Sequence, residues 1–351
     1  MSEDPFGPAD ALSEEQVATA VEAARPDWRL VDAEPIPAGS DILYRVTVEP
    51  DEGRDATTTE RRAVLKCFRP SGPLAGRAPD RVVTEVRLLE LAGAETTVPV
   101  PTVYGFCESH DAVPAPFFLM EYVEGVSETG LSPDVETTER LTREAARYLA
   151  RIHDWRSFEA AGNFAVDDGD VVVDGTARWV DHLHGVVDGA VTHLDETRFS
   201  DLQAPVAEYV EERFTDAAFD AAPVLLHGDY RYGNLVVDPG RATVEAVLDW
   251  GASLAGDRLY ELVWVEAEFA GNAPVGSERR RGVREALYEA YESERGVAFE
   301  RDASFARRER LYRFVKRVIE MRWFPYWHGD LECSERADHA ARLRRGVASM
   351  L

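Results

Sequence analysis

Lysine is nearly absent from this chain. Of the 351 residues only Lys66 and Lys316 are lysines, and every other basic residue is an arginine. Lysine and arginine together number 39 against 65 acidic residues, which gives a net charge of −26. Nucleic acids and anionic membranes bind proteins through a basic surface. The composition therefore argues against both as partners.

The acid excess has two possible explanations. In concentrated salt, acidic side chains keep a protein surface hydrated while ions screen their mutual repulsion. Alternatively, a high genomic GC content favours arginine over lysine in an acidic protein of an ordinary cytoplasm. We favour the first interpretation, that of a halophilic protein.

Cysteine and long apolar runs are also scarce. The three cysteines, Cys67, Cys107 and Cys333, are widely spaced and form no metal motif, so we expect reduced thiols. The sequence has no run of about 18 apolar residues, so no membrane span is expected. Residues 1–4 lack the basic and apolar segments of a signal peptide. We expect a cytoplasmic protein with no membrane partner.

The spacing of apolar residues divides the chain into two parts. Five strands are expected between residues 29 and 120, with one helix inserted at 81–92. Helical spacing then predominates, at 138–155, 200–220, 278–293 and 303–323, with short strands near 224–226 and 235–248. We predict an α+β fold in which residues 1–122 form a small lobe with a five-stranded antiparallel sheet, and residues 123–351 form a larger, mainly helical lobe.

The most informative segment is at residues 226–250. Asp229 is followed by Asn234 five residues later and by Asp249 fifteen residues beyond that, between apolar runs typical of strands. Phosphoryl transfer from ATP needs one carboxylate to accept the proton of the attacking hydroxyl, and an amide and a second carboxylate to hold Mg²⁺. Taken singly, Asp229 and Asn234 would be turn residues. The complete pattern favours Asp229 as the catalytic base and Asn234 and Asp249 as the Mg²⁺ ligands.

The expected phosphate-binding cation is Lys66. It lies within an apolar strand, and a lysine retained in an arginine-rich chain indicates a place that a compact ammonium fits and a guanidinium does not. Its expected ion-pair partner is Glu85 on the following helix. Glu90 is the alternative acid, but it lies about 140° further round the helix. We prefer Glu85 because Val82, Val86 and Leu89 mark the buried face.

The remaining contacts to the nucleotide depend on the backbone. Gly39 and Ser40 would cover the phosphates through N–H groups and the Ser40 hydroxyl, although a plain hairpin turn explains them equally well. Residues 120–123 would form a hinge whose backbone groups, at Glu121 and Val123, contact the adenine edge. A strand end beside a connector is the alternative.

Three further residues surround the central motif. Arg231 is a candidate for neutralising the transferred phosphate, or else a surface arginine. His227 is expected to shape the loop through hydrogen bonds rather than to act as a base. Asp257 is expected to brace the loop by accepting backbone N–H bonds.

These motifs resemble the aminoglycoside phosphotransferase-like family, which has the protein-kinase-like fold. The resemblance rests on residues 227–234, on Leu248-Asp249-Trp250 and on Gly256-Asp257, and it covers roughly residues 30–330. It implies an ATP- and Mg²⁺-dependent kinase acting on a hydroxyl of a small molecule. One departure is Gly251, where the family often has Glu.

By the same resemblance Asp229 would be the catalytic base, Asn234 and Asp249 would bind Mg²⁺, and Lys66 and Glu85 would hold ATP. A regulatory nucleotide-binding protein without activity is the alternative, although no expected catalytic position is replaced. A protein-substrate kinase fits less well, because the glycine-rich loop signature is missing.

The acceptor is not identified by these motifs. Aromatic and acidic residues of the helical lobe would suit a cationic or polyhydroxylated acceptor, with packing inside the helical core as the alternative. The candidate residues are Trp179, His182, Glu261, Trp264, Glu268, Trp323 and Tyr326.

The halophilic interpretation predicts that the fold requires salt. Lowering KCl from about 3 M to about 0.05 M should lower the melting temperature, because weaker screening leaves the acidic surface to repel itself. Circular dichroism at several KCl concentrations measures this. An unchanged melting temperature would contradict the interpretation.

Overall fold

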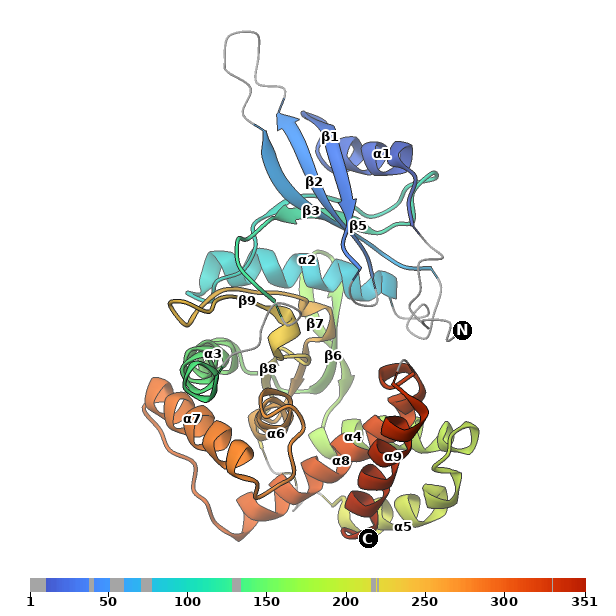
Figure 1. The fold of residues 1–351 in the computed structure, drawn as a ribbon, viewed down its shortest axis with the longest axis vertical. Helices are drawn as coiled ribbons and strands as arrows, with labels where there is room; N and C mark the ends of the chain where they lie inside the picture. The colour runs from blue at the N-terminus through green and yellow to red at the C-terminus, as the bar shows by residue number, and fades with distance from the viewer. Residues whose placement is uncertain are drawn as a thin grey trace.

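The chain folds into two lobes stacked along its long axis (Figure 1). The computed structural model describes residues 11–37, 41–50, 60–70, 78–127, 134–215, 219, 221–329 and 331–351. The smaller lobe holds an antiparallel sheet and the larger lobe is mainly helical, so the predicted α+β class is confirmed.

A five-stranded antiparallel sheet in the order β1-β2-β3-β5-β4 forms the smaller lobe. Its strands are β1 (Trp28–Pro35), β2 (Ile42–Pro50), β3 (Arg61–Cys67), β4 (Val103–Cys107) and β5 (Phe117–Glu121). Every second residue of β2 is buried, as in a strand with one face on a core. In β3 residues 63–67 are all buried, because this central strand is covered on both faces. The predicted sheet is confirmed.

Helix α1 (Glu14–Ala24) covers one face of this sheet. It begins with a capping box, in which the Gln16 N–H donates to Ser13 Oγ over 3.2 Å and the Ser13 N–H donates to Gln16 Oε1 over 3.0 Å. The buried side of the helix, including Val17 and Val21, packs with the apolar residues of β2 and β3 in one core. This packing holds α1 on the face of the sheet that is turned away from the larger lobe.

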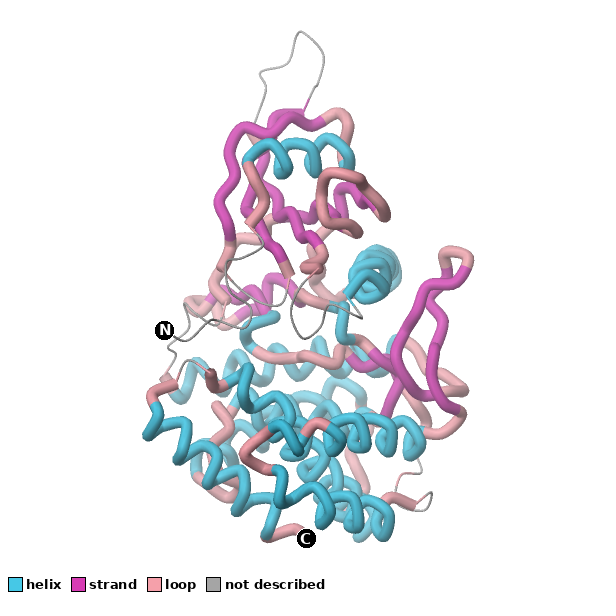
Figure 2. Tube along the Cα trace, turned by 90° about the vertical axis from the view of Figure 1, so that its right-hand side faces the viewer, coloured by secondary structure: helices cyan, strands magenta, loops and turns pink. Residues whose placement is uncertain are grey.

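The opposite face of the sheet meets α2 (Ala78–Glu95), which lies between the two lobes (Figure 1). Val82, Val86 and Leu89 of α2 belong to a core that continues into the larger lobe. In Figure 2 a long hairpin of that lobe rises beside α2, and Arg87 Nε donates to the Gly169 carbonyl at the hairpin turn over 2.6 Å. The division after residue 122 stays a prediction, because both lobes share the core that contains α2.

That hairpin was not predicted. Its strands, β6 (Ala161–Asp167) and β7 (Asp170–Thr176), pair with β11 (Leu254–Gly256) and β8 (Val224–Leu226) in the order β7-β6-β11-β8. The signal was present in the sequence, since an Asp168-Gly169 turn is followed by three consecutive valines. A second, two-stranded sheet joins β9 (Leu235–Asp238) to β10 (Thr243–Val247), where one strand was expected at 235–248.

Helices make up most of the larger lobe. They are α3 (Val135–Trp155), α4 (Trp179–Thr192), α5 (Gln203–Arg213), α6 (Arg258–Phe269), α7 (Glu278–Arg295), α8 (Ala303–Trp327) and α9 (Cys333–Ala348). The predicted helix at 200–220 is shorter than expected and ends at Arg213. Within the described ranges no helix combines the length and apolar character needed to cross a membrane. The long α8 instead buries polar residues, among them Lys316.

Candidate active site

The catalytic loop begins where β8 ends, at residue 226. Gly228 follows with φ +84°, and a Cβ on it would lie 2.0 Å from the Ala252 carbonyl oxygen, so only glycine fits this close approach. Tyr230 is buried and its hydroxyl donates to the Ala145 carbonyl of α3 over 2.8 Å. The loop is therefore held on both sides of Asp229.

Asp229 is oriented by its own loop. Asn234 Nδ2 donates to Asp229 Oδ2 over 2.7 Å and to the Asp229 carbonyl over 2.8 Å. Arg231 Nε lies 3.2 Å from both carboxylate oxygens. The side chain is 40% exposed, so a substrate can reach it. Partial burial raises the pKa of the Asp229 carboxyl. The positive charge of Arg231 opposes this increase.

A buried carboxylate on α6 supports the loop from below. Glu261 Oε1 accepts the Gly228 N–H over 2.5 Å, and Glu261 Oε2 accepts the His227 N–H over 3.0 Å. His153 Nε2 lies 2.8 Å from Glu261 Oε2, while His153 Nδ1 lies 2.7 Å from the Tyr291 hydroxyl. Helices α3, α6 and α7 thus fix the catalytic loop through one network. His153 and Tyr291 were not predicted, because nothing in the sequence brings three helices together at this point.

His227 has the structural role that was expected. Its Nδ1 accepts the Asp229 N–H over 3.3 Å, so its Nε2 carries the proton and donates to the Leu248 carbonyl over 2.9 Å. The imidazole thus ties the catalytic loop to the residue before Asp249.

The two predicted metal ligands lie side by side because of the β9–β10 pairing. Asn234 directly precedes Leu235, which pairs with Val247, and the Leu248 N–H donates to the Asn234 carbonyl over 2.8 Å. Asp249 follows at once. The Asn234 amide nitrogen faces Asp229, so its oxygen is the atom of that side chain suited to a cation. One amide oxygen and one carboxylate, completed by phosphates, form a donor set that fits Mg²⁺.

Asp249 has a left-handed backbone conformation, with φ 59° and ψ 64°, which is uncommon for any residue except glycine. Arg81 of α2 supports the turn, since its Nε donates to the Gly251 carbonyl over 2.9 Å. A Cβ on Gly251 would lie 3.5 Å from Glu85 Oε2. The position at which the family often has Glu thus faces the acid of α2.

Lys66 joins the two lobes. Its Nζ lies 2.7 Å from Glu85 Oε2 on α2, 3.0 Å from Asp249 Oδ1 and 3.3 Å from Asp41 Oδ2. The lysine is 4% exposed. A buried ammonium of this kind is tolerated only with such partners. The predicted pair Lys66–Glu85 is present in the structure, and Glu90 instead pairs with Arg87 over 3.0 Å.

The charges of this cluster shift one another's pKa values. Burial opposes the charged form of Lys66, but Asp249 and Glu85 raise its pKa well above the usual range. Asp249 is buried too, and Lys66 and Arg81 nevertheless lower its pKa to about 2. Burial raises the pKa of Glu85 to about 7 against the attraction of Lys66. Lys66 and Asp249 are therefore the firmly ionised members.

The other predicted nucleotide contacts are less defined. The Glu121 N–H donates to the Thr102 carbonyl over 2.8 Å, and its carboxylate accepts from the Thr102 hydroxyl over 3.0 Å. Val123 lies in the connector after β5. Their contacts to adenine stay a prediction. Gly39 and Ser40 lie outside the described residues.

Asp257 braces the site from further away. As the N-cap of α6 it accepts the Leu259 N–H over 2.9 Å, and it also accepts from Tyr312 over 2.6 Å and from Arg308 over 2.8 Å. It therefore fixes α6, which carries Glu261.

The residues expected to line an acceptor pocket do not form one group. Trp179 and Glu261 are buried, and Glu261 braces the catalytic loop. Trp264 and Glu268 instead lie beside Lys316. Core packing, the alternative interpretation, thus applies to part of the set.

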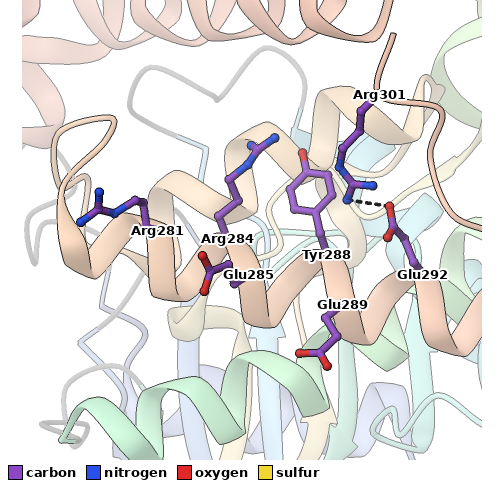
Figure 3. A pocket seen from close by; sticks show the side chains of 7 residues that line it. All are labelled: Arg281, Arg284, Glu285, Tyr288, Glu289, Glu292 and Arg301. Carbon is purple, nitrogen blue, oxygen red and sulfur yellow. Dashed lines mark ion pairs between the residues drawn. The ribbon is translucent and has the colours of Figure 1, made fainter.

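A separate hollow of about 530 Å³ lies on α7 (Figure 3). It is lined by Arg281, Arg284, Glu285, Tyr288, Glu289, Glu292 and Arg301. Arg284 and Tyr288 point to one side of α7 and Glu289 to the other, while Arg301 reaches toward α7 from the segment that follows it and pairs with Glu292 over 2.8 Å. No predicted site residue belongs to it, and its charges balance, so we interpret it as a hydrated helix surface.

The two-lobed fold is that of the kinase-like phosphotransferases. Residues 44–307 match the model of the phosphotransferase enzyme family, so the chain belongs to that family. Solved structures with this fold are similar over nearly the whole length. A putative aminoglycoside phosphotransferase from Ralstonia eutropha JMP134 is 16% identical, with a TM-score of 0.60 and 96% of both chains covered. Aminoglycoside phosphotransferase APH(4)-Ia, in a complex with AMP-PNP and hygromycin B, is 15% identical with a TM-score of 0.61, covering 92% of this chain and 93% of that one.

Curated relatives are larger proteins. Acyl-CoA dehydrogenase family member 10 of Mus musculus is 29% identical over 211 residues, which are 58% of this chain and 18% of that protein. Probable acyl-CoA dehydrogenase IBR3 of Arabidopsis thaliana is 24% identical over 231 residues, 62% of this chain and 26% of that protein. The chain thus matches about a quarter or less of their lengths.

The loop network predicts a specific effect of Glu261→Gln. The amide keeps the shape but presents an NH₂ group to donors, so the free energy of unfolding at neutral pH should fall by about 2 kcal/mol. Hydrogen exchange at residues 227–229 should speed up. Glu289→Gln, at a side chain that is 74% exposed, is the control and should change neither.

The same variant tests the pKa of Glu261. Burial acts to raise this pKa, but the hydrogen bond and charge of His153 lower it below 4.5. The stabilisation from the carboxylate is then complete above pH 4.5 and is lost as the pH falls through the lower folded value. As the pH falls below 4.5 the wild type should lose more stability than Glu261→Gln. Parallel acid limbs in the two unfolding curves would contradict this.

Proposed function

We propose that this protein transfers the γ-phosphoryl group of ATP to a hydroxyl of a small molecule in a Mg²⁺-dependent reaction. One observation carries the proposal. Lys66 from the sheet of one lobe meets Asp249 of the other lobe, and Asp249 adjoins Asn234, which holds the carboxylate of Asp229. The residues that we propose as base, metal ligands and phosphate-binding cation thus contact one another, which supports a role in phosphoryl transfer.

Asp229 is suited to receive the proton of the acceptor. As the acceptor oxygen bonds to the γ-phosphorus, the bond from that phosphorus to the leaving ADP oxygen breaks, and the hydroxyl proton passes to Asp229. The hydrogen bond from Asn234 fixes one carboxylate oxygen, and Arg231 Nε lies 3.2 Å from the other. The raised pKa, which burial causes, makes Asp229 a better proton acceptor than a free aspartate.

Lys66 and Arg231 would stabilise negative charge on the phosphates. Lys66 is held by Glu85 within reach of Asp249, so it would approach the α- and β-phosphates as a fixed point charge. Bound by Asn234 and Asp249, Mg²⁺ would neutralise the charge that develops on the β- and γ-phosphate oxygens. Arg231 lies beside Asp229, where the transferred group would pass.

The names of the similar proteins suggest two acceptor classes. APH(4)-Ia was solved with hygromycin B, and APH(2")-IIIa with GDP and kanamycin. The mouse and Arabidopsis relatives are named acyl-CoA dehydrogenases, which suggests hydroxylated acyl compounds. An acceptor panel should therefore contain aminoglycosides, sugars, amino alcohols and hydroxyacyl thioesters, each with ATP and with GTP.

The first test of the proposal is Asp229→Ala. With Mg²⁺-ATP and an acceptor that the wild type phosphorylates, ADP release should fall by about 10³-fold or more, because the proton acceptor is lost. Binding of ATP, measured by calorimetry, should be retained. Nucleotide binding by the wild type without acceptor-dependent turnover across the panel would favour the regulatory alternative.

The second test is Lys66→Arg. Charge is conserved, but the larger guanidinium fork cannot occupy the space between Glu85 and Asp249, so the Kd for ATP should rise by about tenfold or more. Arg87→Lys, on the outer side of α2, is the matched control and should bind ATP normally. Equal ATP affinity in Lys66→Arg and the wild type would rule out this role for Lys66.

A further inference from the structure

The second lysine of the chain is enclosed as fully as the first. Lys316 of α8 is 5% exposed. Its Nζ lies 3.0 Å from Glu268 Oε1 at the end of α6 and 3.1 Å from Asn272 Oδ1 in the turn that follows. It also contacts Glu320 one helical turn further along α8, and it lies 4.7 Å from the ring centre of Trp264.

These partners form a complete binding site for an ammonium group. An ammonium has three N–H donors, and here three side-chain oxygens, from Glu268, Asn272 and Glu320, can accept them. The aromatic face of Trp264 covers the group, as in sites that bind cationic ligands. We call these four residues the ammonium cradle. It has two carboxylates for one ammonium, and those of Glu268 and Glu320 are 30% and 20% exposed.

The cradle lies next to the catalytic loop. Phe269, the neighbour of Glu268, stacks on the ring of Tyr232 at 4.2 Å with an interplanar angle of 13°. Tyr232 is three residues after Asp229. The end of α6, which carries Glu268, therefore packs against the loop that would carry out the transfer.

We propose that Lys316 occupies, from within the protein, the place where an ammonium of the acceptor would otherwise bind. The enzyme would then select hydroxyl acceptors that are neutral or anionic at this end and would disfavour polycations. The aromatic and acidic residues of the sequence suggested a cationic or a polyhydroxylated acceptor, and this proposal disfavours the cationic one. The part of this inference that concerns acceptor choice rests on the proposed function. The existence of the ammonium cradle does not depend on it.

The choice of lysine supports this assignment. The chain uses arginine at every basic position except two, and both exceptions are buried against two or more carboxyl or amide oxygens. A planar guanidinium would direct its five donors into one plane, whereas these three oxygens approach a single point. The cradle is thus shaped for a primary ammonium.

Amine rescue tests the cradle without nucleotide. Lys316→Ala should lower the melting temperature by roughly 5 °C or more, because two carboxylates lose their partner. Ethylammonium chloride should recover about half of that loss, through binding in the vacated space. Tetramethylammonium chloride, at equal ionic strength, cannot donate hydrogen bonds and should recover none. Lys316→Met fills the space with an apolar side chain, so it should not respond to either salt.

Polycation binding tests the effect on specificity. Kanamycin should bind Lys316→Ala about tenfold more tightly than the wild type or Lys316→Met, as measured by calorimetry. Equal kanamycin affinity in the three proteins, or ethylammonium rescue no greater than that by tetramethylammonium, would overturn the proposal. If Lys316→Ala does not fold, Glu320→Gln provides the second measurement. It should weaken the cradle and lower the melting temperature while leaving kanamycin binding unchanged.

These outcomes are separate from those of the proposed function. Absence of turnover with every acceptor would contradict the kinase assignment but would leave amine rescue unaffected. Conversely, rapid wild-type phosphorylation of kanamycin would support the kinase assignment and would overturn the role of Lys316.

Discussion

The arrangement of the whole site depends on one buried ammonium. Lys66 comes from the central strand of the small lobe, and its carboxylate partners come from the helix between the lobes and from the turn after β10. Removing the ammonium of Lys66 would leave these carboxylates without their common partner in a poorly solvated space, which is strongly unfavourable. The two lobes are therefore held in relation to each other by electrostatics at the same point where the nucleotide would bind. Packing of α2 into the core of the larger lobe reinforces that relation.

Much of this was predictable from short-range pattern. The apolar residues of β2 indicated a strand, and apolar residues at helical spacing indicated α3 and α7. The intervals among Asp229, Asn234 and Asp249 indicated the catalytic loop. These predictions succeed because periodicity and turn chemistry are local. The Lys66–Glu85 pair was predictable as well, although it joins two elements, because one face of α2 was marked by its apolar residues.

What was not predictable depends on contacts between distant elements. Nothing near Glu261 in the sequence indicates that its carboxylate reaches the backbone of the catalytic loop, and the partner of His153 is 108 residues away. The β6–β7 hairpin was overlooked because valine runs occur in buried helices as well as in strands. The role of Lys316 was missed for another reason. Helical spacing could have indicated Glu320, four residues further along α8, but Trp264, Glu268 and Asn272 lie about 44 or more residues earlier, and no local spacing reveals them.

The scarcity of lysine has a practical consequence. Both lysine side chains are enclosed by acidic partners, and neither presents its nitrogen to solvent. Reagents that acylate or cross-link primary amines would find no accessible lysine on this protein, and enzymes that acetylate or ubiquitinate lysine would find none either. A reactive group carried by a nucleotide analogue would behave differently, because at the proposed nucleotide site the lysine that it would meet is Lys66. A residue type that occurs only twice in the chain would thus become a selective target for chemical labelling of the interior.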